Sequence, residues 1–211
     1  MSSSPFIDSL VATAEPVRPR RVSREILAVI AIALVQFAGT YVLVLGDGFQ
    51  QALLWDPARA IFKMALLGAG TIGFTLMALY SFGPSARRIG PFTAVMSAVL
   101  FLLALMGFDW SLAGSLSAAF APQHGSACVA GILALALPLI LVLSLLMMRG
   151  ASVQPGQSAL LVGLAGGTWG AFIYSLQCPF VSLWYLAAWY GGGIFIVTLA
   201  ARLILPRLAR W

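Results

Sequence analysis

Two cysteines are the residues of this chain best suited to reversible chemistry. Cys128 opens a long apolar stretch, and Cys178 closes the next one directly before Pro179. Their midpoint, residue 153, lies in the sequence RGASVQPGQS at 149–158, whose glycines and proline predict the turn of a helical hairpin. Each arm is then about 20 residues long, at about 1.5 Å of rise per residue. Both sulfur atoms are therefore expected at the same depth, at one end of the hairpin.

A disulfide between the two arms requires an unusually close approach of the helices. Packed helices run about 8 to 10 Å apart, whereas bonded cysteines need Cα atoms about 4.4 to 6.8 Å apart. The sequence GLAGGTWG supplies two small-xxx-small pairs, Gly163 with Gly167 and Gly166 with Gly170. Such pairs allow a neighbouring backbone to come near. The sequence does not determine which helix packs on each glycine face.

The two thiols are not expected to be equivalent. Cys128 starts a predicted helix, where the helix dipole favours the thiolate, whereas Cys178 ends one. This asymmetry predicts Cys128 as the attacking sulfur. The alternative is that both cysteines are small buried residues without chemistry. His124 precedes Cys128 by four residues and is a weak candidate metal ligand, but a complete site needs further ligands, so no metal and no cofactor is predicted.

The composition indicates an integral membrane protein built only from helices. Hydrophobic residues make up 61% of the 211 residues and charged residues 9%, and the mean hydropathy is +1.00. About 20 apolar residues are needed to cross a bilayer. Six stretches meet or approach this length: 26–45, 61–82, 91–108, 128–148, 158–177 and 183–205. The first stretch is too long for the apolar core of a cleaved signal peptide, so six transmembrane helices are expected.

The arginines and lysines predict the orientation of these six helices. Short cytoplasmic loops carry an excess of positive charge. One side of the predicted topology holds ten such residues: Arg18, Arg20, Arg21, Arg24, Arg87, Arg88, Arg149, Arg202, Arg207 and Arg210. The other side holds only Arg59 and Lys63. Both termini are therefore predicted to be cytoplasmic, and the net charge of +6 is explained by topology and anionic lipid rather than by direct nucleic-acid binding.

The predicted cytoplasmic segment 1–25 carries a pattern of its own, ahead of a membrane domain at 26–205 and a tail at 206–211. Ser4 and Pro5 suit the start of a helix, and Pro16 ends it. Between them runs one apolar stripe, formed by Phe6, Ile7, Leu10, Val11 and Ala14. A helix of about 11 residues is marginal alone in water. Its apolar stripe is expected to lie either on the membrane surface or in a groove of a partner protein.

The chain lacks the motifs of the common enzyme classes. It has no phosphate-binding glycine loop, no G-x-S-x-G sequence, no H-E-x-x-H sequence and no C-x-x-C pair. The chain is therefore not expected to be an enzyme. Two alternatives stay open: a small transporter or permease subunit for an uncharged solute, and a membrane thiol-disulfide oxidoreductase. The predicted spans contain no acidic residue, which argues against proton-coupled transport.

Nearly the whole length of the chain resembles the negative regulator of sigma F family, six-span anti-sigma factors of the bacterial inner membrane. The resemblance rests on the order and spacing of several segments: FIDSLVATAEPVRPRR, WDPARAIFKMALLGA, CVAGILALALPLILVLSLLMMRGA, and GLAGGTWGAFIYSLQCP followed by LWY. Members often carry a histidine before the second cysteine and an acidic residue after the proline. This chain has Gln177 and Phe180 there, which weakens a metal-binding role more than a disulfide role.

The family resemblance implies a function that could not be inferred from composition and residue spacing. It implies that the N-terminal segment holds an extracytoplasmic-function sigma factor at the inner membrane. It also implies that Cys128 and Cys178 are needed to respond to oxidative or other thiol-reactive stress, such as heavy metals. The sequence does not tell whether the two cysteines are bonded at rest or only under stress, and it does not determine the oligomeric state.

Overall fold

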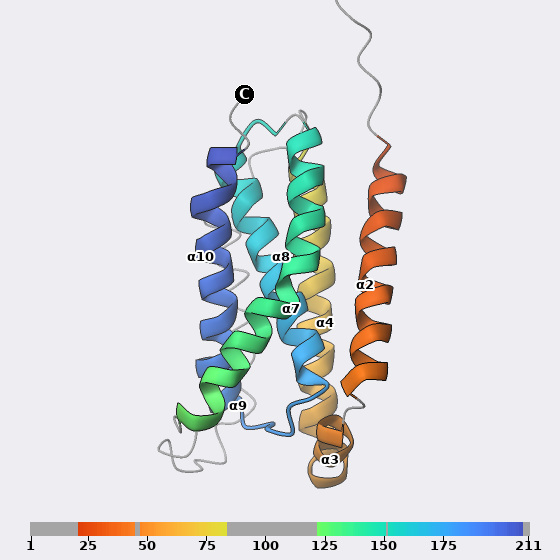
Figure 1. Ribbon diagram of the computed structural model, residues 1–211, viewed down its shortest axis with the longest axis vertical. Helices are drawn as coiled ribbons and strands as arrows, with labels where there is room; N and C mark the ends of the chain where they lie inside the picture. Colours follow the sequence, from red (N-terminus) through yellow and green to blue (C-terminus); the bar gives the residue numbers. More distant parts are fainter. Residues whose placement is uncertain (1–20, 45–46, 84–121, 151, 209–211) are drawn as a thin grey trace, which may run out of the picture.

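The computed structural model describes residues 21–44, 47–83, 122–150 and 152–208, and in these ranges every regular element is helical (Figure 1). The elements are α2 (Val22–Val44), α3 (Asp47–Trp55), α4 (Pro57–Ser81), α7 (Pro122–Arg149), α8 (Pro155–Ser175), α9 (Leu183–Tyr185), the π-helix η1 (Leu186–Tyr190) and α10 (Gly191–Leu208). The all-helical fold class is thus confirmed for the part of the chain that the structure describes.

Five helical segments are long and apolar enough to cross a membrane, among the residues described. They coincide with five of the six predicted spans. The remaining predicted span, 91–108, and the predicted amphipathic helix with its apolar stripe lie outside the described residues and stay predictions. The short helix α3 was not predicted, because its nine residues DGFQQALLW fall between two long apolar stretches and carry no strong pattern of their own.

The helix ends are placed as a six-span topology requires. The start of α2 and the end of α10 lie at the same end of the bundle (Figure 1). The end of α4 and the start of α7, which flank residues 84–121, lie at opposite ends. Which end faces the cytoplasm remains a prediction from the arginine distribution.

Helix α8 forms the centre of the bundle and is buried by α4, α7 and α10. One glycine face packs on α10. A Cβ atom added at Gly163 would lie 2.6 Å from the Cα atom of Thr198, and one added at Gly167 would lie 3.1 Å from the Cα atom of Ile194. A larger side chain at Gly163 would force the two backbones apart, and one at Gly167 would make an unusually tight contact. The predicted close approach is confirmed, and α10 is the partner of this face.

The second glycine face of α8 packs on α7. A Cβ atom added at Gly170 would meet the carbonyl oxygen of Ile132 and would lie 2.9 Å from the backbone nitrogen of Ala136. One added at Gly166 would meet the side chain of Ile140. The helical hairpin predicted from the turn at 149–158 therefore has its arms in direct backbone contact.

Helix α7 continues through Pro138 and changes direction along its length (Figure 1). Proline removes one backbone hydrogen bond and its ring crowds the preceding turn, which is the usual cause of a kink. The first half of α7 therefore leans across the start of the last span, where it contacts η1. This lean carries Cys128 toward the aromatic residues of η1.

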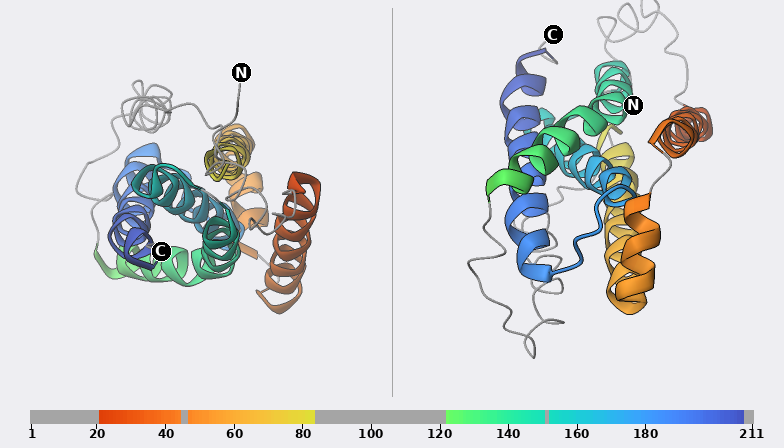
Figure 2. Two further views of the ribbon diagram at one scale, coloured as in Figure 1. Left: turned by 90° about the horizontal axis from the view of Figure 1, so that it is seen from above. Right: turned by 60° about the horizontal axis from the view of Figure 1, so that its bottom comes forward.

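Helix α2 stands apart from the other spans and keeps most of its side chains exposed (Figure 2). Its polar link to the bundle is Gln36. The Gln36 amide donates to the carbonyl oxygen of Leu135 on α7 at 2.7 Å and accepts from the Trp169 indole on α8 at 2.9 Å. Gln36 therefore ties α2 to both arms of the hairpin.

Replacing Gln36 with leucine is expected to loosen α2. Both hydrogen bonds are lost and the indole of Trp169 keeps no partner for its N–H. Each such bond between membrane helices contributes about 0.6 to 2 kcal/mol, so the free energy of unfolding should fall by about 1 to 3 kcal/mol. Unfolding in mixed micelles measures it, with the exposed Gln51→Leu on α3 as the control. Equal stability of the two variants would contradict this role of Gln36.

Candidate functional site

Cys128 and Cys178 meet inside the protein at one end of the hairpin. Both are buried, with 2% and 4% of their surface exposed. Their thiols form a hydrogen bond with each other, and both are free rather than joined in a disulfide. The structure thus brings together the two residues singled out from the sequence, in the reduced state.

Local backbone structure sets the position of each sulfur. Cys128 lies in the second turn of α7, because the helix starts at Pro122, six residues earlier than predicted. The effect of the helix dipole fades beyond the first turn. The prediction that the dipole favours the thiolate of Cys128 is therefore wrong. Cys178 follows the end of α8, and Pro179 has no N–H with which to continue a helix.

The two thiols differ in how readily they lose a proton. The hydrogen bond with Cys128, together with burial, raises the pKa of the Cys178 thiol above its ordinary value. Cys178 therefore keeps its proton more firmly than a free cysteine does. The attack by Cys128 stays a prediction.

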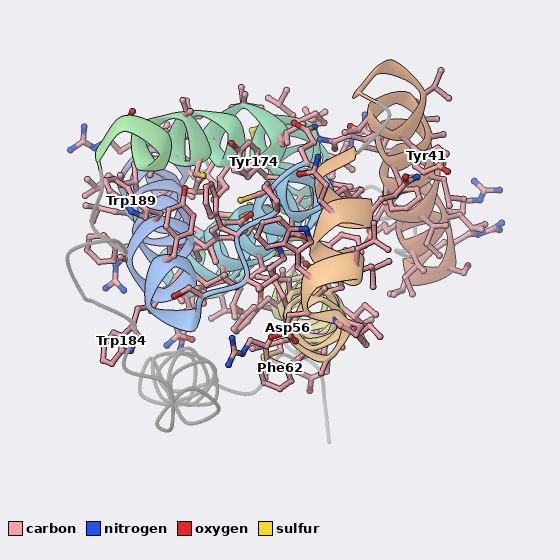
Figure 3. All side chains as sticks on the ribbon, turned by 90° about the horizontal axis from the view of Figure 1, so that it is seen from below. Tyr41, Asp56, Phe62, Tyr174, Trp184 and Trp189 are labelled. Carbon is pink, nitrogen blue, oxygen red and sulfur yellow. The ribbon has the colours of Figure 1, made fainter. Side chains whose placement is uncertain are left out.

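Three tyrosines surround the thiols. The hydroxyl oxygen of Tyr185 lies 2.9 Å from the sulfur of Cys128, within hydrogen-bonding distance. Tyr190 lies beside Cys178 and meets the ring of Tyr174 edge-on, with 6.1 Å between ring centroids. Tyr185 is buried, with 4% of its surface exposed. Figure 3, drawn from this end, shows Tyr174 inside the bundle and Trp184 and Trp189 at its edge.

The π-helix η1 explains why two of these tyrosines face the same site. The N–H of Gly191 donates to the carbonyl of Leu186, five residues earlier, in place of the usual four. The wider turn brings residues five apart onto nearly the same face, which places Tyr185 and Tyr190 together. Such π-turns are rare and are found frequently at functional sites. No signal in the sequence indicated it.

Lys63 is a site residue that the sequence analysis missed. The predicted span 61–82 places it near a membrane boundary. It is fully buried, and its amine donates to the carbonyl oxygens of Cys178 at 2.9 Å and Phe180 at 3.2 Å. The available signal was its place in the sequence, one turn after Arg59 on the otherwise apolar helix α4.

The remaining site predictions are not tested by the structure. His124 belongs to the first turn of α7, where the structure describes the backbone but not its side chain. Within the described ranges, no group of three His, Cys, Asp or Glu side chains is arranged to hold a metal ion. The apolar stripe of the N-terminal segment precedes residue 21, where the described part of the chain begins.

A bundle of apolar helices with a buried thiol pair at one end defines a helical membrane protein. The chain belongs to the family described as negative regulator of sigma F, whose sequence model matches residues 10–211. The anti-sigma-F factor NrsF of Caulobacter vibrioides (strain NA1000 / CB15N) is 29% identical over 233 residues, which cover the whole of both chains. No solved structure matches. The family resemblance seen in the sequence is confirmed.

Proposed function

We propose that this protein is a membrane-bound anti-sigma factor that releases its sigma factor when Cys128 and Cys178 react with an oxidant or another thiol-reactive agent. The N-terminal segment holds an extracytoplasmic-function sigma factor at the cytoplasmic face of the inner membrane. Family membership supports the anti-sigma role. The observation that carries the sensing role is the pair of free, hydrogen-bonded thiols contributed by two different helical segments.

A hydroperoxide can oxidise the two thiols to a disulfide in two steps. The sulfur of Cys128 attacks the peroxide, the O–O bond breaks, and a sulfenic acid and one water form. The sulfur of Cys178 then attacks the sulfenic sulfur, the S–O bond breaks, and the hydroxyl leaves as a second water with the proton of Cys178. Two thiols and one hydrogen peroxide thus become one disulfide and two waters. A soft metal cation would instead displace both thiol protons and bind the two sulfurs.

The packing offers a route from the thiols to the N-terminal segment. A disulfide holds its sulfurs about 2.05 Å apart, so bonding draws the sulfur of Cys128 toward Cys178 and alters its contact with the hydroxyl of Tyr185. The resulting shift of α7 reaches Leu135, whose carbonyl oxygen binds Gln36 of α2. Helix α2, which begins at Val22, joins the N-terminal segment to the bundle. A coupling of about 1 to 3 kcal/mol would change the affinity for the sigma factor by about 5- to 150-fold.

Deleting residues 1–16 tests the assignment of the capture segment. We expect the truncated protein to lose co-purification with the sigma factor, because the apolar stripe is removed while the membrane domain at 26–205 is left whole. A finer test compares Leu10→Asp, on the stripe, with Ser9→Asp, off it. Capture should be lost only in the first. Retention of the sigma factor by the truncated protein would show that another surface holds it.

A further inference from the structure

Lys63 places a cation against the thiol pair. Its side chain has no exposed surface, and it reaches from α4 to the loop that carries Cys178. Its amine donates to carbonyl oxygens on both sides of Pro179, those of Cys178 and Phe180. Both partners are neutral. Lys63 therefore fixes the loop but receives no charge compensation from these hydrogen bonds.

A buried ammonium group without an opposite charge is unfavourable, and buried charges are normally paired. A thiolate of the cysteine pair could supply that charge, since Lys63 lies within electrostatic range of both Cys178 and Cys128. The carboxylate of Asp56 at the start of α4 pairs with Arg59 at 3.3 Å. A thiolate in the cysteine pair is thus the group on the described chain that best complements Lys63.

The other titratable groups around the thiols belong to three further elements. They are Tyr174 on α8, Tyr185 on α9 and Tyr190 on η1. Tyrosine hydroxyls are neutral at physiological pH and stabilise a thiolate only by hydrogen bonding. Of the described groups that face the pair, Lys63 is the one whose side chain can carry a positive charge.

We propose that Lys63 is the positioning residue of the thiol sensor: it clamps the Cys178 loop to α4 and stabilises negative charge on the thiol pair. This inference rests on the proposed role of the two thiols as the sensor. Thiolates react with oxidants and alkylating agents, whereas thiols do not. Lys63 accordingly sets the pH range in which the pair is reactive.

The rate of iodoacetamide alkylation, measured against pH on the full-length protein in lipid nanodiscs, tests this role. Mass spectrometry identifies the modified cysteine. In Lys63→Met we expect the midpoint of the pH profile to rise by about one unit or more, because an adjacent opposite charge favours a thiolate by about one to three units. Alkylation at pH 7 should then be about tenfold slower or more. Arg59→Met, which removes a charge one turn earlier on α4, should leave the profile unchanged.

Two further variants separate charge from hydrogen bonding. Lys63→Arg keeps the charge and should keep the midpoint near that of the wild type. Lys63→Gln keeps hydrogen-bond donors without the charge and should shift the midpoint as Lys63→Met does. If Lys63→Met does not accumulate in the membrane, the comparison of Lys63→Arg with Lys63→Gln still tests the charge role of Lys63. An unchanged midpoint in Lys63→Gln, or equal midpoints for Lys63→Gln and Lys63→Arg, would overturn the charge role of Lys63.

The experiment distinguishes failure of this inference from failure of the proposed function, because it needs no sigma factor. If the midpoint is unchanged but sigma release still depends on both cysteines, Lys63 has no role in setting reactivity and the thiol sensor stands. If the midpoint shifts but oxidation never releases the sigma factor, Lys63 tunes the pair as inferred and the sensing function is wrong.

Discussion

Replacing Cys128 with serine is expected to leave capture of the sigma factor intact and to abolish its release by hydroperoxide. Serine keeps an oxygen in place of the sulfur and can still hydrogen-bond to Tyr185, so the reduced packing is preserved. It cannot form a sulfenic acid or a disulfide. The change in affinity on oxidation, about 5- to 150-fold in the wild type, should fall to none.

The measurement is the dissociation constant for the sigma factor, with the membrane protein in nanodiscs before and after treatment with hydrogen peroxide. Cys178→Ser is the informative companion. If release requires a disulfide, Cys178→Ser must also fail to respond. Full release in Cys178→Ser would show that oxidation of Cys128 alone is sufficient and would contradict a disulfide switch.

Replacing Gly170 with alanine should separate the two arms of the hairpin. The added Cβ atom would meet the carbonyl oxygen of Ile132 and lie 2.9 Å from the backbone nitrogen of Ala136. Both neighbours are backbone atoms of α7, which cannot move away by a change of rotamer, so α7 itself must move. Forcing extra volume into packed contacts costs about 1 to 3 kcal/mol. Because Cys128 lies one turn before Ile132, its sulfur should also move away from Cys178.

Two measurements check the Gly170→Ala prediction: the free energy of unfolding in mixed micelles, and the rate of disulfide formation with hydrogen peroxide. Both should fall. Gly73→Ala on α4 is the matched control, since nothing lies within 4 Å of its added Cβ atom and alanine favours a helix. Wild-type stability together with a wild-type rate in Gly170→Ala would refute the tight contact between α7 and α8.

The sequence predicted the hairpin and the thiol pair because both depend on local signals. Apolar length defines the helices, the turn at 149–158 sets the register, and glycines on two faces of α8 permit close packing. The equal distance of Cys128 and Cys178 from that turn then brings their sulfurs together. Only the last step joins residues far apart in the chain, and there the turn between the two helices sets their register.

The rest of the site could not be predicted, because it depends on contacts between distant segments. Lys63 and Cys178 are 115 residues apart, and an apolar helix with one lysine near its end is compatible with a solvated amine as well as a buried one. The π-turn that places Tyr185 and Tyr190 on one face leaves no periodic signal. The partner helix of each glycine face likewise follows from the assembled bundle.

The central claim is that bonding of Cys128 to Cys178 releases the sigma factor. The most direct test treats intact cells with hydrogen peroxide, traps free thiols with an alkylating reagent, and divides each sample in two. One half is analysed by mass spectrometry for the peptide pair linked through Cys128 and Cys178, and the other for co-purified sigma factor. The account predicts that the linked peptides appear as the sigma factor leaves, with the same dependence on dose and time. Release of the sigma factor while both cysteines remain free and unmodified would contradict it.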